Sequence, residues 1–250
     1  MRALVIDCPA PPKRVRRDKF SSFNSTSHIS ITPSNNRRHQ DAESAKSISK
    51  NEDPSVTKQW DDSASTEEKF NDAFAITDKL KICMFGSARN GIGPVSRAMA
   101  VAKRSGPDFL FLANANSQKF DDLEHNLSLC QIAFHDSQSQ NWCCISGEAV
   151  KTSADDKRIK EIYNPSVKAW FGDLGDGTHD GGPEDPRVKL IEVRAKYISY
   201  WKSTVGSAEE YKKEIEEAAK TGGVAKTGVL RNMKEDEIKE YRSKNSSLTS

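Results

Sequence analysis

The sequence has no long hydrophobic run. Its 250 residues are 35% hydrophobic and 30% charged, and the longest apolar stretches, such as Phe109–Ala113, have the length of a strand. A helix that spans a membrane needs about 20 consecutive apolar residues, so we expect no membrane-spanning segment. An excess of one charge sign is also lacking, because the formal net charge is only +2. This balance favours neither a nucleic acid nor a membrane surface as partner.

Motifs for metal binding and for catalysis by protein side chains are missing. The five histidines form no pair at metal-ligand spacing, and the five cysteines fit no zinc or redox motif. The odd number of cysteines and the lack of a signal peptide favour free thiols in a reducing compartment, which we take to be the cytoplasm. In the loop "DGTHDGGPEDPR" the third position is Thr178, and the twelfth is Arg187, where a calcium loop needs a bidentate Glu. Any chemistry is therefore expected to depend on a bound cofactor.

Residues 1–60 lack apolar periodicity and are rich in serine, proline, asparagine and arginine. Such a segment cannot bury enough surface to offset its ordering entropy, so we expect a disordered extension. Its first 40 residues carry eight Lys or Arg against two Asp. This composition is typical of a mitochondrial transit peptide, which is the alternative localisation, although Asp7 and the prolines of 9–12 interrupt an amphipathic helix. A plain basic tail is the other interpretation.

The central segment, 65–203, predicts one folded domain that is mainly β. Ser65 followed by Glu68 has capping-box spacing before a helix. After residue 79, short apolar runs alternate with turn signals such as Asn90–Gly91, which predicts about six strands in hairpins with short helices between them. The imperfect alternation in the last strand, 187–201, indicates a bulge. Residues 204–250 are expected to form a charged tail, partly helical.

The candidate anion site is the strand–helix junction at 109–126, "FLFLANANSQKFDDLEHN". The first turn of a helix has unpaired N–H groups and a positive dipole end, which suit a phosphate. Ser117 can donate its hydroxyl, and Lys119 supplies a positive charge. Arg97, on a strand expected to pair with 109–114, would complete a two-pronged grip. Alternatively, Ser117 only caps the helix and Lys119 is a solvated surface residue.

Several stretches, in this order and at this spacing, resemble the FMN-binding split-barrel family. More narrowly, the sequence is similar to the general-stress-protein branch of the pyridoxamine-phosphate-oxidase-like proteins. The resemblance covers about residues 67–233, and "TGGVAKTGVLRNM" also resembles the blue-light-induced proteins of filamentous fungi. The stretches are "GPVSRAMAV", "DFLFLANANSQKFDDLEHN", "ISGEAV", "YNPSVKAWF" and "EDPRVKLIEVRAKYISYW".

The resemblance implies a six-stranded antiparallel split β-barrel that forms a homodimer with FMN at the subunit interface. FAD is the alternative cofactor. In the family, the "SR-M" strand and the "S-x-K" helix start hold the FMN phosphate. It also implies aromatic residues near the flavin ring or the dimer seam, although ordinary core packing is the alternative for each of these. The implied cofactor-binding residues are Ser96, Arg97, Met99, Asn114, Ser117, Gln118, Lys119, Trp142 and Trp170.

The sequence departs from the family in two places. Gln118 stands where the oxidases usually carry arginine, which removes one positive charge from the grip. The C-terminal arginine and histidine that recognise the pyridoxal substrate are missing, because the barrel ends at "YISYW", so vitamin B6 oxidation is not expected. Three functions remain open: a flavin-dependent oxidoreductase related to stress or light response, a flavin carrier or sensor without turnover, and a cofactor-free interaction module.

Overall fold

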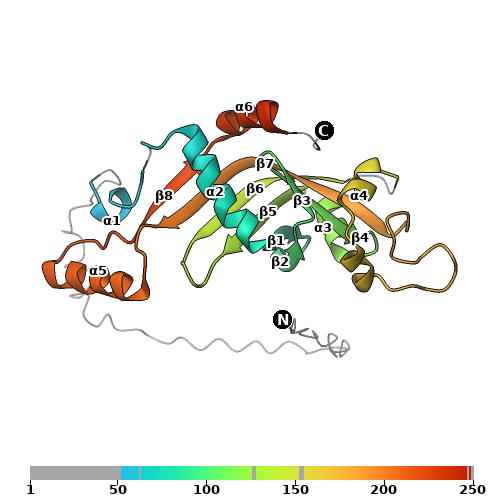
Figure 1. Ribbon diagram of the computed structural model, residues 1–250, viewed down its shortest axis with the longest axis horizontal. Coiled ribbons are helices and arrows are strands. Elements are labelled where there is room, and N and C mark those ends of the chain that lie inside the picture. The colour runs from blue at the N-terminus through green and yellow to red at the C-terminus, as the bar shows by residue number, and fades with distance from the viewer. Residues whose placement is uncertain (1–51, 62, 126–127, 152–154, 247, 249–250) are drawn as a thin grey trace, which may run out of the picture. The chain divides into compact units, whose positions relative to one another are not determined.

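The computed structural model describes residues 52–61, 63–125, 128–151, 155–246 and 248 (Figure 1). The expectation for residues 1–51 therefore lies outside the described residues. No described helix is long and apolar enough to cross a membrane. The helices are α1 (Pro54–Thr57), α2 (Thr66–Leu80), α3 (Gln118–His125), α4 (Lys157–Ile162), the 3₁₀ helix η1 (Pro165–Trp170), α5 (Ala208–Thr221) and α6 (Glu235–Asn245). The strands are β1 (Ile82–Arg89), β2 (Gly93–Ala100), β3 (Lys103–Ser105), β4 (Asp108–Asn114), β5 (Leu129–His135), β6 (Trp142–Lys151), β7 (Val188–Ser203) and β8 (Gly228–Met233).

All eight strands join one antiparallel sheet. The order is β2-β1-β5-β6-β7-β4-β3, and β8 also pairs with β7. Strand β7 is long enough to hold two neighbours on one edge: Phe109–Asn114 pair with its first half and β8 pairs with its second half. No ladder of described residues joins β2 to β3, so the sheet stays open. The expectation of a mainly β split-barrel architecture with short flanking helices is confirmed, with β3 and β8 as additional strands.

The core lies between the concave face of the sheet and the helices that cross it, α2 most visibly (Figure 1). Helix α2 begins where expected, because the Ser65 hydroxyl accepts a hydrogen bond from the Glu68 N–H at 3.2 Å. Phe70 and Phe74 recur at helical spacing and are buried against the sheet, as are Phe120 and Leu123 of α3. The apolar side chains that alternate along the strands and those that recur at helical spacing in α2 and α3 thus pack in the same core.

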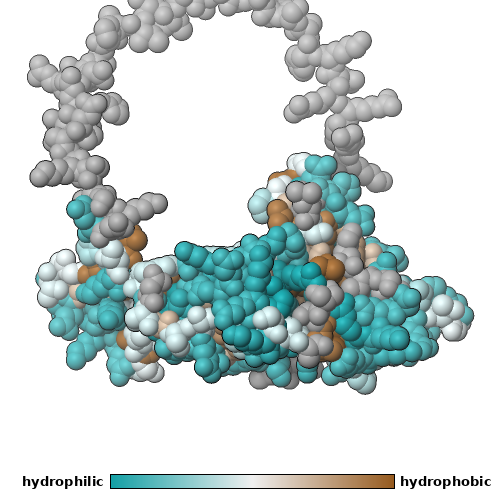
Figure 2. All heavy atoms as spheres, turned by 90° about the horizontal axis from the view of Figure 1, so that it is seen from above, coloured by the Kyte–Doolittle hydropathy of each residue, from teal (hydrophilic) through white to brown (hydrophobic). Residues whose placement is uncertain are grey.

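The chain beyond the central segment also packs on this sheet. Residues 59–61 lie beside β8: the Leu230 N–H donates to the Gln59 carbonyl at 2.7 Å. The 204–250 segment contains the expected helices α5 and α6, but β8 between them extends the sheet. In α6, Ile238 is buried and Tyr241 stacks on Phe70 at 3.9 Å between ring centroids. Helix α6 is therefore part of the folded unit, although its exposed side is charged and the surface there is mainly hydrophilic (Figure 2).

The expected bulge in the last strand is present. The register between β6 and β7 moves from Ser146–Tyr197 to Gly147–Ala195, which leaves Lys196 as the extra residue of β7. At this point the two backbones lie so close that a Cβ on Gly147 would meet the Arg194 carbonyl oxygen at 1.9 Å. A side chain at position 147 therefore has to displace backbone rather than a flexible side chain.

We expect Gly147→Ala to lower the free energy of unfolding by about 1–3 kcal/mol, or more if the bulge cannot relax. The measurement is urea denaturation of the full chain. Gly86→Ala is the matched control, because a Cβ there meets its nearest neighbour at an ordinary 3.5 Å. Equal stability of the two variants would show that the close approach at the bulge does not constrain the fold.

Candidate functional site

Arg97 points to the inner face of the sheet. Alternate residues of β2 are partly buried and exposed, and the position of Arg97 is among the partly buried ones. Its Nη2 donates to Asp122 Oδ2 at 2.7 Å, and its Nη1 donates to the Ser87 hydroxyl at 2.8 Å. The strand pairing differs from the expectation. Arg97 lies opposite Phe85 of β1, and residues 109–114 pair with β7, because the β1–β2 turn at Asn90–Gly91 closes a local hairpin.

The polar turn at 114–117 orients Lys119. The Asn114 side chain accepts from the Asn116 N–H at 2.9 Å, and the Ser117 hydroxyl donates to the Asn114 carbonyl at 2.6 Å. The same hydroxyl accepts from Lys119 Nζ at 2.7 Å. These hydrogen bonds place the Ser117 hydroxyl between the turn and Lys119, rather than as a side-chain cap of α3. The role of Asn114 in this arrangement is to shape the turn.

Lys119 and Arg97 lie near each other. Burial lowers the pKa of Lys119, and the positive charge of Arg97 lowers it further. Lys119 is half-buried, and none of the described carboxylates lies within ion-pair distance of its ammonium group. Two cations held together without enough counter-charge attract an anion, and a phosphate can satisfy both. The structure therefore brings Arg97, Ser117 and Lys119 together.

Three residues that the sequence did not single out complete this cluster: Ser87, Arg89 and Asp122. Asp122 is an acidic residue on a short helix, but its side chain is only 1% exposed. It accepts from Arg89 Nε at 2.9 Å and from the Ser87 hydroxyl at 3.2 Å, in addition to Arg97. The hydrogen bond from Arg89, followed by that from Arg97, lowers the pKa of Asp122 although burial opposes this. The cluster contains three cations, Arg89, Arg97 and Lys119, and one carboxylate, Asp122. It therefore has an excess of two positive charges.

Three of the other predicted residues on β2 and α3 are engaged outside this cluster. Ser96 is on the opposite face of β2 from Arg97, because neighbouring residues of a strand alternate in direction. Met99 shares the face of Arg97 but packs against the hydrophobic core. Gln118 is exposed, and its amide donates to Asp121 at 3.1 Å. These positions can contribute to a cofactor site only outside the cation cluster.

The two tryptophans of the predicted set lie elsewhere. Trp142 opens β6 opposite His135 and Trp201. Strand β6 is the third strand from β2 in the sheet order, which separates Trp142 from Arg97 by roughly 14 Å across the strands. Trp142 is also three positions along β6 from the residue in register with Arg97, which adds a separation of roughly 10 Å along the strand. Trp170 ends η1 and is 78% exposed. The strand register therefore keeps Trp142 away from the cation cluster, and the Trp170 side chain is exposed to solvent.

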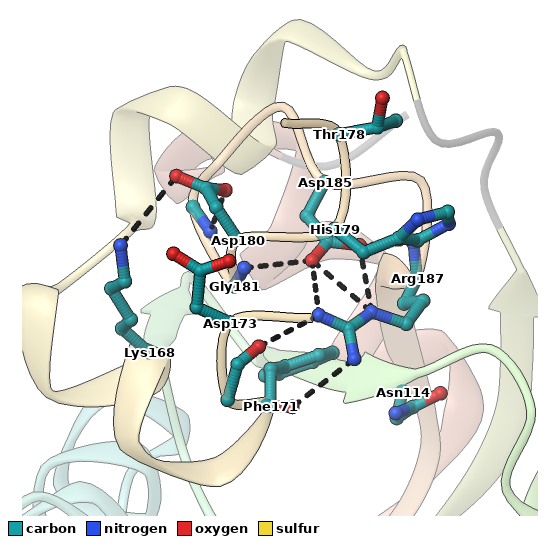
Figure 3. A network of polar contacts seen from close by, with 12 residues as sticks. Asn114, Lys168, Phe171, Asp173, Thr178, His179, Asp180, Gly181, Asp185 and Arg187 are labelled. Atoms are coloured by element: carbon teal, nitrogen blue, oxygen red, sulfur yellow. Dashed lines mark hydrogen bonds and ion pairs between the residues drawn. The ribbon is translucent and has the colours of Figure 1, made fainter. Parts of the chain in front are cut away.

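A second polar network holds the loop between η1 and β7, beside Asn114 (Figure 3). The Arg187 guanidinium donates to Asp185 at 2.6 Å and to the Phe171 carbonyl at 3.1 Å, so one side chain ties both ends of the loop together. The Arg187 carbonyl in turn accepts from the Ala115 N–H at 2.8 Å. This network positions the loop next to the turn that carries Ser117. No group of His, Cys, Asp or Glu among the described residues is arranged to hold a metal ion.

The Asp185–Arg187 pair predicts a stability change in acid. Hydrogen bonds from Arg187 are the main reason that the pKa of Asp185 falls from 3.8 to about 2. Because the folded-state pKa is depressed, the stabilisation is complete above pH 3.8 and is lost as the pH falls toward 2. We expect the stability difference between the wild type and Asp185→Asn to shrink over this range. Urea denaturation at several pH values measures it, with Asp173→Asn of the same loop as control. A difference that stays constant down to pH 2 would contradict the assignment.

The outer face of strands β1, β2 and β5 carries no charged residue. Ile82, Met84 and Leu129 on this face are exposed by 61%, 46% and 54%. The alternating residues of the face are Ile82, Met84, Gly86, Ala88, Pro94, Ser96, Ala98, Ala100, Leu129, Gln131, Ala133 and His135. A groove of about 420 Å³ crosses it between Gly86, Ser96 and Gln131. An uncharged surface of this extent is unusual on a chain with 30% charged residues.

Comparisons with known proteins agree with this architecture. The family model described as "Pyridoxamine 5'-phosphate oxidase like" matches residues 66–224. Protein bli-3 of Neurospora crassa is 36% identical over 197 residues, which covers 76% of this chain and 91% of that protein.

Two crystal structures have a similar fold. One, from Clostridium acetobutylicum, is a protein related to general stress protein 26 of B. subtilis. It is 15% identical with a TM-score of 0.50, and the match covers 70% of this chain and 99% of that one. The other, from Jannaschia sp. CCS1, is described as a general stress protein 26. It is 16% identical with a TM-score of 0.51, and the match covers 67% of this chain and 99% of that one. The matched family model, the bli-3 relative and the shared sheet lead to one conclusion: the chain belongs to the pyridoxamine 5'-phosphate oxidase-like family.

Proposed function

We propose that this protein binds FMN, with the phosphate held by Arg97, Ser117 and Lys119. The observation that carries the proposal is the half-buried Lys119 beside Arg97, without a described carboxylate of its own. The family membership supports a flavin as the ligand class. Charge-assisted hydrogen bonds from an arginine, a lysine and a hydroxyl are the donors that a phosphate group requires. When bound, the flavin would supply the capacity to accept and donate hydride.

FMN is favoured over FAD by the charge of the cluster. The terminal phosphate monoester of FMN carries close to two negative charges at neutral pH. The two phosphates of FAD are joined by an anhydride bond, carry one charge each and lie side by side along a chain. The cluster around Asp122 concentrates two positive charges in excess at a single place. This arrangement suits one dianionic group better than two monoanionic groups.

We propose further that the outer face of β1, β2 and β5 is the interface of a homodimer, and that the flavin ring reaches it. The support is the uncharged surface and the groove that crosses it between Gly86, Ser96 and Gln131. Ser96 is on this face while Arg97 is on the other, so β2 presents one side to the phosphate cluster and the other to the interface.

This interface predicts that Met84→Glu gives a monomer. Met84 lies centrally on the face, opposite Ala98 and Ala133, and a buried unpaired carboxylate would strongly destabilise the contact. Sedimentation equilibrium measures the mass. The control is Ile215→Glu on α5, because Ile215 is exposed to a similar extent, 42% against 46%. A dimer of Met84→Glu with unchanged affinity would place the interface elsewhere.

The reaction class that we propose is a flavin-dependent oxidoreductase, with a flavin carrier or sensor as the alternative. Two of the described thiols, Cys83 and Cys130, are poor nucleophiles, because burial raises the pKa of each to about 12. Oxidation of a pyridoxal-type substrate is not proposed. The two arginines that follow β7 are both held in ion pairs, Arg231 by Asp61 at 2.6 Å and Arg242 by Asp108 at 2.7 Å. We also propose the role in stress or light response that the sequence resemblance implies.

The absorption spectrum of the purified full chain tests the function. We expect a bound flavin, either as purified or after FMN is added, that loses its visible absorption when NADPH or NADH is supplied. A bound flavin that no nicotinamide reduces would favour the carrier. A protein that stays colourless after addition of FMN would contradict both flavin functions and favour the interaction module.

A further inference from the structure

The carboxylate of Asp122 joins two arginines from different strands. Arg89 from the end of β1 donates to it through Nε at 2.9 Å and through Nη2 at 3.2 Å. Arg97 from β2 donates to it at 2.7 Å. Arg89 Nη2 and Arg97 Nη2 share one oxygen atom, Oδ2, so the two guanidinium groups are neighbours. Without the carboxylate, these like charges would repel each other and move toward solvent.

Asp122 also stands next to Lys119. The two residues are three apart on α3, a spacing that places side chains on neighbouring positions of one helix face. Lys119 feels the positive charge of Arg97. Arg89, Arg97 and Lys119 therefore surround the same corner between β1, β2 and the start of α3. Asp122 is buried, whereas the side chains of Arg89 and Arg97 are 33% and 23% exposed, so the cations and not the carboxylate face the approach of a ligand.

We propose that Asp122 is a positioning residue that holds Arg97 and Arg89 in fixed orientations beside Lys119, and that Arg89 is a third cation of the phosphate grip. Asp122 engages Nε and Nη2 of Arg89 and leaves Nη1 outside these bonds. A long, flexible side chain loses much rotamer freedom when it binds a ligand, and a carboxylate that fixes it beforehand removes part of that cost. The grip is thus assembled before the ligand arrives. This inference rests on the proposed function, because it assumes that the ligand carries a phosphate.

The test compares FMN with riboflavin, which has the same ring and ribityl chain but no phosphate. Fluorescence titration of the full-length wild type gives the ratio of the two dissociation constants. We expect Arg89→Gln to weaken FMN binding about tenfold, which corresponds to one lost charge-assisted contact. Riboflavin affinity should stay unchanged. Asp122→Asn should also weaken FMN binding about tenfold and leave riboflavin affinity unchanged, because disordered cations bind phosphate less well even though a negative charge is gone.

Arg104→Gln is the matched control. Arg104 likewise holds one carboxylate, Asp78, through two hydrogen bonds of 2.8 and 2.7 Å. It lies on β3, at the end of the sheet order opposite to β2. General loss of structure would lower the affinity for both ligands, whereas loss of the grip lowers the FMN affinity alone. If Asp122→Asn does not fold, Arg89→Gln still decides the matter.

Two further results separate this inference from the proposed function. In the Arg89→Gln/Arg97→Gln background, Asp122→Asn should cause little additional loss, because Asp122 acts through those two arginines. An unchanged FMN-to-riboflavin ratio in Arg89→Gln, or FMN binding by Asp122→Asn that is as tight as in the wild type, would overturn the inference while the flavin function stands. A wild type that binds neither flavin would instead remove the proposed function.

Discussion

Replacing Arg97 and Lys119 together by alanine should weaken FMN binding by about 3–6 kcal/mol, because each charge-assisted contact contributes roughly 1.5–3 kcal/mol. In dissociation constants this is at least a hundredfold. The two residues are close enough for Arg97 to lower the pKa of Lys119, so their effects should not add fully. Titration of both single variants and of the double variant with FMN measures the loss and the coupling.

The control for this experiment removes two cations from elsewhere on the surface. Lys168→Ala/Arg104→Ala takes away partners of Asp180 and Asp78, at 3.6 Å and 2.7 Å. We expect this variant to bind FMN as the wild type does. Equal FMN affinity of the Arg97→Ala/Lys119→Ala variant and the wild type would refute the assignment of the phosphate site.

The second large effect concerns the ion pair between Arg242 of α6 and Asp108 of the sheet. Arg242 donates to the two oxygens of Asp108 at 2.7 and 2.8 Å, and Asp108 is fully buried. Asp108 also accepts from the Ala195 N–H at 2.9 Å. Removing one partner of a buried ion pair leaves an uncompensated charge and typically costs 3–5 kcal/mol. We therefore expect Arg242→Met to lower the free energy of unfolding by about this amount, as measured by urea denaturation.

Two variants sharpen the interpretation of this result. Lys244→Ala on the same helix breaks an exposed pair with Glu240, which should cost at most about 1 kcal/mol. Asp108→Asn/Arg242→Met replaces the orphaned carboxylate by a neutral amide that can still accept from Ala195, so it should recover part of the loss. If Arg242→Met were no less stable than Lys244→Ala, α6 would not be held by this pair.

Much of the fold was predictable because the signals are local. The capping residue Ser65, the alternation of apolar residues in the strands and the turn at Asn90–Gly91 act over a few positions. Strand β8 was not predictable in this way, because Arg231 interrupts its apolar pattern. Its burial depends on three carboxylates from α2 and the segment before it, Asp61, Glu68 and Asp72, which lie more than 150 positions away in the sequence.

In the candidate site, too, the residues with a local sequence signal were predictable, and those that depend on distant partners were not. Ser117 and Lys119 were predictable, because a strand–helix junction with a hydroxyl and a lysine is a local pattern. Asp122 and Arg89 were not, since an acid on a short helix resembles any solvated position until its distant partners are known. The sequence did contain one indication of this cluster, the β1–β2 hairpin. Its pairing places Arg97 opposite Phe85, and it places Arg89, at the end of β1, on the same side of the sheet as Arg97. A helix docked there then needs an acid on that side.

The most direct test of the central claim is a titration of the full-length protein with FMN, followed by isothermal calorimetry. The account predicts saturable binding of one FMN per chain, much tighter than the binding of riboflavin, because the cations around Asp122 recognise the phosphate. Equal affinity for FMN and riboflavin, or no heat of binding for either, would contradict it.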